Sequence, residues 1–81
     1  MNQSNIIRKI VVGADPKNGL AYKLGNTVGQ YEIVDIQLDE RAQSLYGLER
    51  YLIYVQEPAG GIVLWKMVSS CPVMIEFDIN F

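Results

Sequence analysis

Residues that could carry chemistry are few in this sequence. It contains no histidine and a single cysteine, Cys71. Histidine is the commonest general base and a usual zinc or copper ligand, so its absence argues against Ser-His or Cys-His catalysis and against those metal sites. One thiol can form neither a thiolate cluster nor an internal disulfide. We therefore expect no bound metal and no catalysis based on histidine.

The acidic residues give little support for catalysis or metal binding either. Asp35, Asp39 and Glu40 lack a glycine-rich or metal-binding loop around them, so solvation of the surface is their simplest role. The segment from Gly13 to Gly19 has neither the spacing of a phosphate-binding loop nor a helical pattern after it. The sequence thus predicts a protein that is not an enzyme and that uses no cofactor.

Aromatic and basic side chains remain, and these suit recognition of another surface. Trp65 stands beside Lys66, and Tyr22, Tyr51 and Tyr54 fall in predicted strands. Such residues stack on nucleic-acid bases or anchor a protein partner. For Trp65 the alternative is a place in the core, and the strand pairing described below favours it.

Binding of nucleic acid is one hypothesis. It would use the basic residues with Tyr22 as a stacking platform, namely Arg8, Lys9, Lys17, Tyr22, Lys23 and Lys66. Phosphate neutralisation dominates such binding, so a net charge of −2 and a pI near 4.9 count against it. A further alternative is a small ligand such as a nucleotide, seated between subunits and bound as an anion by the backbone amides of the loop from Asp15 to Gly19.

A β-hairpin over residues 50–68 organises the chain. Its two runs are rich in β-branched and aromatic residues, and residues 57–61 place a proline and a glycine as a type I turn requires. A five-residue loop puts three pairs on one face: Val55 with Val63, Ile53 with Trp65, and Tyr51 with Met67. The other face carries Tyr54 opposite Leu64, Leu52 opposite Lys66, and Ile62.

Both faces of this hairpin are largely apolar, so both must be covered. We expect the first face to fill the core. The second is expected to form an interface, most simply between two copies of the chain, through Leu52, Tyr54, Ile62 and Leu64. Alternatively, the chain stays monomeric because the strand over residues 6–12, or a short helix near Leu45 and Tyr46, covers that face.

Further strands are predicted over residues 6–12, 20–24, 31–38 and 73–81, with a brief extended piece at 27–30. Residues 1–5 are expected to fray. Along 31–38, alternation places Val34, Ile36 and Leu38 on one face. In the C-terminal strand it turns four side chains inward: Ile75, Phe77, Ile79 and Phe81. Asp39 and Gly47 are placed to cap one short helix near residues 40–46, for which a loop is the alternative.

These elements predict a mainly β fold, either a small antiparallel barrel or two packed small sheets of five to six strands. With 81 residues and 49% hydrophobic composition, the chain is expected to form a single small domain over residues 1–81. Its apolar runs are too short to cross a bilayer and no signal pattern opens it, so we expect it in the cytoplasm.

Two stretches resemble known proteins. The run Tyr22-Lys23-Leu24-Gly25-Asn26-Thr27-Val28, with Gly29 to Ile33 after it, resembles the opening of Tudor-like and KOW-like small barrels, although Asn26 replaces their usual aspartate. Residues 9–13, 21–25 and 75–81 resemble small uncharacterised proteins of gut Bacteroides phages. The first resemblance implies a small barrel that binds RNA, DNA or peptides. The second implies work in a bacterial host cytoplasm or a virion.

The leading hypothesis is therefore a small β-rich interaction protein whose partner is a protein, most simply itself. As a phage protein it would be a structural or host-interaction component.

Overall fold

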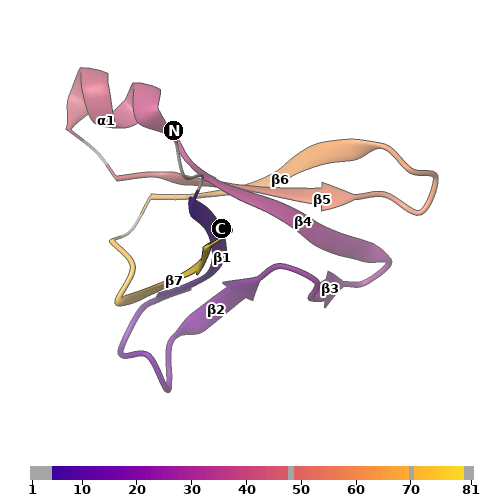
Figure 1. Cartoon of the computed structure of the whole chain (residues 1–81), viewed down its shortest axis with the longest axis horizontal. Helices are drawn as coiled ribbons and strands as arrows, with labels where there is room; N and C mark the ends of the chain where they lie inside the picture. The colour runs from indigo at the N-terminus through magenta and orange to yellow at the C-terminus, as the bar shows by residue number, and fades with distance from the viewer. Residues whose placement is uncertain (1–4, 48, 70, 80–81) are drawn as a thin grey trace.

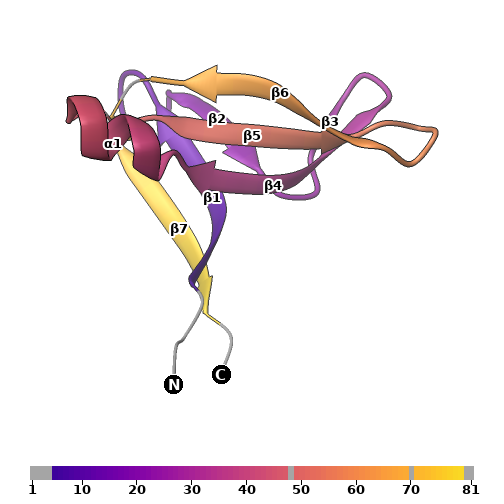
Figure 2. The ribbon, with the colours of Figure 1, turned by 90° about the horizontal axis from the view of Figure 1, so that it is seen from above.

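The structure is a computed structural model that describes residues 5–47, 49–69 and 71–79. Within these ranges the chain forms two antiparallel sheets and one helix (Figures 1 and 2). The elements in chain order are β1 Asn5–Val12, β2 Leu20–Lys23, β3 Thr27–Val28, β4 Tyr31–Leu38, α1 Glu40–Tyr46, β5 Tyr51–Gln56, β6 Ile62–Val68 and β7 Met74–Ile79. The predicted mainly β class, with one short helix, is confirmed.

The two sheets are joined by a bent ribbon made of β2 and β3. One sheet has the strand order β2-β1-β7 and the other the order β3-β4-β5-β6. At the bend, the Leu24 amide donates to the Arg8 carbonyl of β1, whereas the Gly25 amide donates to the Ile33 carbonyl of β4, both at 2.9 Å. Gly25 has a φ of 90°, which suits glycine far better than other residues. The described strands therefore form two linked small sheets rather than a closed barrel.

The core lies between the two sheets and draws on both. Ile10 of β1 and Ile53 of β5 are fully buried, and Tyr22 of β2 is 5% exposed. The predicted inward face of β5 is confirmed, because Tyr51 and Val55 are buried with Ile53. The buried cluster is completed by Ile7, Val12, Ile33, Ile36 and Val68.

The short helix α1 forms where its caps predict it. The Asp39 carboxylate accepts a hydrogen bond from the Ala42 amide, and Gly47 adopts the left-handed conformation with a φ of 65°. The Gly47 amide then donates to the Gln43 carbonyl. Both ends of this one-to-two-turn helix are thus satisfied, which a helix of this length requires. The alternative of a loop over residues 40–46 is wrong.

Strand β4 matches its predicted bounds but not its predicted faces. Its pairing with β5 shifts between Ile33 and Asp35, so Val34 is the extra residue of a β-bulge. Ile33 and Ile36 are buried while Val34 is only partly buried. The predicted row of Val34 with Ile36 is therefore wrong, because the extra residue reverses the alternation of the strand.

A second bulge changes the hairpin of β5 and β6. The predicted pairs Val55 with Val63 and Tyr54 with Leu64 are confirmed. Beyond them the pairing shifts, and Trp65 is the extra residue of β6. The three other predicted pairs are wrong, since the structure pairs Ile53 with Lys66, Leu52 with Met67, and Tyr51 with Val68.

The predicted core role of β6 is also wrong. Trp65 is 38% exposed, Val63 is 41% exposed and Met67 is 54% exposed, so none of the three lies in the core. Val68 is the buried residue of this strand at 6% exposure. Val68, at the C-terminal end of the strand, is thus the residue of β6 that belongs to the buried cluster.

Strand β7 supports the core through one of its predicted inward residues. Ile75 packs against the buried cluster, as expected. Phe77 lies on the same face as Ile75 and opposite the buried Ile7, so it points inward as predicted, yet it is 48% exposed. Figure 2 shows the physical reason, because this part of β7 runs with β1 away from the four-stranded sheet, which cannot cover it. The side chains of Ile79 and Phe81, and residues 1–4, lie outside the described part of the structure.

Candidate protein-interaction surface

The four residues predicted to form an interface lie on one face of the β5–β6 hairpin. Tyr54 is directly opposite Leu64, and Ile62 is opposite Gln56 on the same face. Leu52 alternates with the buried residues Tyr51 and Ile53, so it points away from the core. Met67, opposite Leu52, joins this face because of the bulge at Trp65. We call the five residues the outer patch: Leu52, Tyr54, Ile62, Leu64 and Met67.

The outer patch is most exposed along β6. Ile62 is 62% exposed, Met67 is 54% exposed and Leu64 is 45% exposed, whereas Leu52 and Tyr54 of β5 are partly buried. Sequence reasoning missed Met67, because nothing in the residue types of β6 announces a bulge. The result is an apolar surface concentrated on one strand.

A polar stripe borders the outer patch on β4. The pairing of β4 with β5 places Gln37 opposite Leu52, Asp35 opposite Tyr54, and Glu32 opposite Gln56. The Gln37 side-chain amide donates to the Asp35 carboxylate at 2.6 Å. The same face of the sheet therefore changes from acidic and polar on β4 to apolar on β6.

Strand β6 is also an edge of its sheet. In the order β3-β4-β5-β6 it pairs with β5 on one side, and no other described strand pairs with it. Figure 1 shows β5 and β6 as long neighbouring strands that end in a common turn. An edge strand presents unpaired backbone amides and carbonyls that can bind a further strand.

The elements expected to cover this face in a monomer do not lie over it. Strand β1 pairs with β2 and β7 in the other sheet. Helix α1 lies beyond one end of the four-stranded sheet in Figure 1, and its Leu45 and Tyr46 are 63% and 70% exposed. Among the described residues, neither predicted monomeric cover reaches the outer patch.

The other side of β6 carries a small aromatic cluster. Trp65 lies edge-on against Tyr22 of β2, and the Lys66 ammonium lies 5.5 Å from the centre of the Tyr22 ring. The same ammonium is 5.6 Å from the Trp65 ring. Tyr22 is buried, so it cannot serve as the predicted platform for a nucleic-acid base.

The predicted basic residues do not form one patch, although three of them, Arg8, Lys9 and Lys23, lie around Glu76. Arg8 donates to the Glu76 carboxylate of β7, and Lys9 lies opposite both Lys23 and Glu76 in the strand pairing. The hydrogen bond from Arg8 lowers the pKa of Glu76 below its usual value. Lys66 belongs to the aromatic cluster instead. The predicted basic residues therefore lie in separate places, and the Glu76 carboxylate neutralises part of their charge.

The loop predicted to bind an anion uses its own amides. The Lys17 and Asn18 amides each donate to the Asp15 carboxylate at 2.8 Å, and the Gly19 amide donates to the Asp15 carbonyl at 2.7 Å. The hydrogen bonds from Asn18, with that of Lys17, lower the pKa of Asp15. A negative charge thus already occupies these donors, which removes the basis of the predicted anion site.

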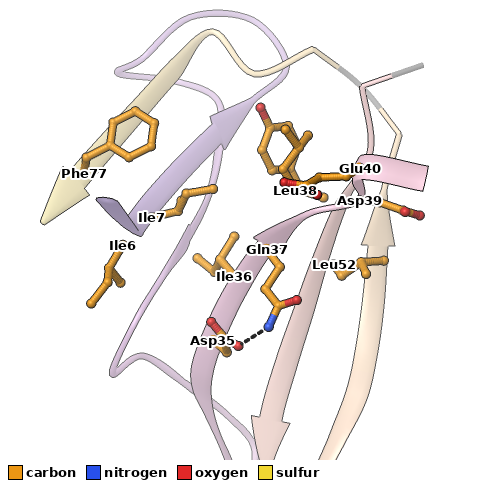
Figure 3. A pocket seen from close by; sticks show the side chains of 11 residues that line it. Ile6, Ile7, Asp35, Ile36, Gln37, Leu38, Asp39, Glu40, Leu52 and Phe77 are labelled. Atoms are coloured by element: carbon orange, nitrogen blue, oxygen red, sulfur yellow. Dashed lines mark hydrogen bonds between the residues drawn. The ribbon is translucent and has the colours of Figure 1, made fainter. Parts of the chain in front are cut away.

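A groove of about 710 Å³ opens between the two sheets (Figure 3). Its floor includes Ile7 and Ile36, and carboxylates stand at its rim. Two of these carboxylates already have hydrogen-bond partners. Asp35 accepts a hydrogen bond from Gln37, and Asp39 accepts one from the first turn of α1. The Arg50 guanidinium also lies 3.7 Å from the Asp39 carboxylate. Apolar and polar side chains thus line the groove together, Leu52 of the outer patch among them, and two of its carboxylates already have partners.

Cys71 belongs to a hydrogen-bonded group at the start of β5. The Cys71 thiol donates to one Glu49 oxygen at 3.2 Å, and the Tyr51 hydroxyl donates to the other at 2.6 Å. The hydrogen bond from Tyr51, followed by that from Cys71, lowers the pKa of Glu49. The carboxylate in turn raises the pKa of the Cys71 thiol, so this cysteine is a weaker nucleophile than a free one.

The described residues contain no group of three or more His, Cys, Asp or Glu side chains placed to hold a metal ion. In the same part of the chain, no helix has the length and apolar character needed to cross a membrane.

The fold and surface place the chain among small β proteins built from two linked antiparallel sheets. Comparisons with known protein families, with curated proteins and with solved structures found no match.

Proposed function

We propose that this chain is a non-enzymatic interaction protein that binds a protein partner, a second copy of itself included, through the outer patch of the β5–β6 hairpin. The observation that carries the proposal is the concentration of exposed apolar side chains on β6, including Ile62 at 62% and Met67 at 54% exposure. Soluble domains rarely leave such contiguous apolar surface uncovered.

The composition of the patch supports a protein partner over a nucleic acid. Ile62, Leu64 and Met67 are aliphatic, and their polar neighbours on β4 include the carboxylates of Glu32 and Asp35. These carboxylates would repel a phosphate backbone, whereas an apolar centre with a polar rim is the usual composition of a protein interface. Tyr54, partly buried at the centre of the patch, can act as its anchor.

A structural or regulatory role fits this kind of binding. The resemblance to small proteins of gut Bacteroides phages supports a role as a phage structural or host-interaction component, which would place the chain in the host cytoplasm or in the virion. Catalysis is not part of the proposal, since the chain has no histidine and its one thiol is hydrogen-bonded to Glu49.

Photo-crosslinking from the patch tests the proposal. A photoreactive phenylalanine analogue at Ile62 should form adducts with protein, either in the purified sample or in a bacterial lysate. The same analogue at Gln37, on the polar stripe of the same face, is the matched control and should form far fewer. The double variant Tyr54→Glu, Leu64→Lys should abolish the adducts while its circular dichroism stays that of a folded β protein.

Two results of this experiment would overturn the proposal. A folded protein that forms no adduct at Ile62 in either sample would overturn it. Adducts that persist unchanged in the double variant would also overturn it, because the contacts would then lie elsewhere.

A further inference from the structure

Strand β6 has the properties of an edge that pairs with another strand. It spans Ile62–Val68, contains no proline, and carries Lys66 as its one charged residue. Natural proteins usually protect a sheet edge with several charges, a proline or a covering segment. Six of its residues, from Ile62 to Met67, are exposed instead.

We propose that two copies of this chain pair antiparallel along β6 and so form one continuous eight-stranded sheet, with a two-fold axis at Leu64. This inference rests on the proposed function and names both the partner and the geometry of its binding. The pairing adds strand to strand by backbone hydrogen bonds, and the outer patches of the two copies become one apolar surface across the junction.

The bulge at Trp65 selects the position of the axis. The outward residues of β6 are Ile62, Leu64 and Met67, because their partners on β5 face outward. Since Trp65 and Lys66 together occupy one step of the pairing, Leu64 is the midpoint of this outward set. A two-fold axis there puts Leu64 beside its own copy and Ile62 beside Met67 of the partner copy, so apolar side chains meet across the junction on the outer face.

The positions of the charged residues are compatible with the same register. Lys66 falls beside Val63 of the other copy rather than beside a second Lys66, so no like charges oppose each other across the junction. The acidic stripe with Glu32 and Asp35 lies on β4, two strands in from the edge. In the eight-stranded sheet the two stripes are about 24 Å apart, beyond the ~8 Å screening length at physiological salt.

The contact area fits a weak, reversible dimer. Five large apolar side chains of β6 are 38% to 62% exposed, namely Ile62, Val63, Leu64, Trp65 and Met67. At about 150 to 200 Å² for each complete side chain they expose roughly 360 to 480 Å² per copy, and strand pairing covers only the flanks that face the junction. The buried area therefore stays below the ~1,000 Å² of a stable specific interface. Such a dimer should dissociate on dilution.

Cysteine crosslinking tests the geometry. In a Cys71→Ser background, Leu64→Cys should give a covalent dimer under mild oxidation, because paired residues have Cα atoms about 5.5 Å apart, within disulfide range. Tyr54→Cys is the matched control on the same face, and it should not crosslink since the two β5 strands are about 14 Å apart. Ile62→Cys mixed with Met67→Cys should give the heterodimer in excess of either homodimer.

Light scattering at micromolar concentration completes the test. The wild type should be a dimer, and Leu64→Lys should weaken the dimer at least tenfold, whereas Gln37→Lys should leave it unchanged.

Crosslinking through Tyr54 but not Leu64 would overturn edge pairing and leave the proposed function standing, because the copies would then pack face to face. A wild-type protein that is monomeric at every concentration would overturn the inference. The proposed function would then be tested on its own by whether the photoreactive group at Ile62 still forms adducts with protein in a lysate.

Discussion

Trp65 lies edge-on against Tyr22, with ring centroids 5.9 Å apart and ring planes at 67°. The two residues come from different sheets, β6 and β2. This T-shaped contact is a geometry that aromatic rings prefer, and it joins the edge strand of one sheet to the edge strand of the other.

The two rings should contribute unequally to stability. Tyr22 is 5% exposed, so Tyr22→Ala should lower the free energy of unfolding by about 3 kcal/mol through the cavity it leaves. Trp65 is 38% exposed, so Trp65→Ala should cost only about 1 to 2 kcal/mol. Urea unfolding followed by circular dichroism measures both. A larger loss for Trp65→Ala than for Tyr22→Ala would contradict the assignment of Tyr22 to the core.

The N-cap of α1 gives a second prediction. The Asp39 carboxylate accepts from the Ala42 amide at 3.3 Å, so Asp39→Ala should lower the free energy of unfolding by about 1 kcal/mol. Asp39→Asn keeps a capping oxygen and loses only the charge interaction with Arg50, so it is the matched control and should stay close to wild type. Equal losses in the two variants would assign the effect to the ion pair instead.

Gly19 should not tolerate a side chain. A Cβ atom there would lie 2.6 Å from the Val12 carbonyl oxygen and 2.8 Å from that of Asp15. These are backbone atoms, so Gly19→Ala should lower the free energy of unfolding by about 1 to 3 kcal/mol. Gly61→Ala is a milder control, because its Cβ would meet only the flexible Glu57 carboxylate at 3.2 Å. Thermal melts of the two variants should separate clearly, and a Gly19→Ala variant with the melting temperature of wild type would contradict the close packing.

Glu49 should make stability depend on acid pH. Its hydrogen bonds from Tyr51 and Cys71 lower the pKa of Glu49 in the folded protein below the unfolded value of 4.5. The deprotonated form therefore stabilises the fold above pH 4.5, and this contribution is lost as the pH falls through the lower folded pKa. Glu49→Gln should be less stable than wild type at neutral pH, and the difference should shrink toward about pH 2.

Urea unfolding at several pH values measures this effect. Glu32→Gln removes the same charge from an exposed position of β4 and serves as the control. If the stability difference between wild type and Glu49→Gln is the same at neutral and acid pH, the hydrogen bonds of Glu49 do not favour its charged form.

Local signals in the sequence predicted most element boundaries. The Glu57 amide donates to the Gly61 carbonyl and the Gly60 amide to the Glu57 carbonyl, which is the turn that Pro58 and its glycines predict. The caps Asp39 and Gly47 located α1 in the same way. Turn and cap chemistry acts over a few residues, so a single sequence contains it.

The bulges could not be predicted from residue types. Val34 and Trp65 are ordinary strand residues, and each becomes the extra residue of its pairing only because of the partner strand. Each bulge reverses the faces beyond it, which is how Met67 reached the outer patch and how Trp65 left the core. The contact of Trp65 with Tyr22 likewise depends on how the two sheets meet. Alternation identified the candidate surface, and tertiary pairing determined its full extent.

The pairing of β1 with β7 also constrains the order in which the protein can fold. Ile7 lies opposite Phe77, so the three-stranded sheet needs two segments that are far apart in sequence. The four-stranded sheet needs only contacts between consecutive strands, which close short loops and form quickly. During synthesis on the ribosome, β1 therefore cannot pair with β7 until β7 itself has emerged. Through that interval one side of β1 has no partner strand, and an unpaired strand edge is prone to aggregation.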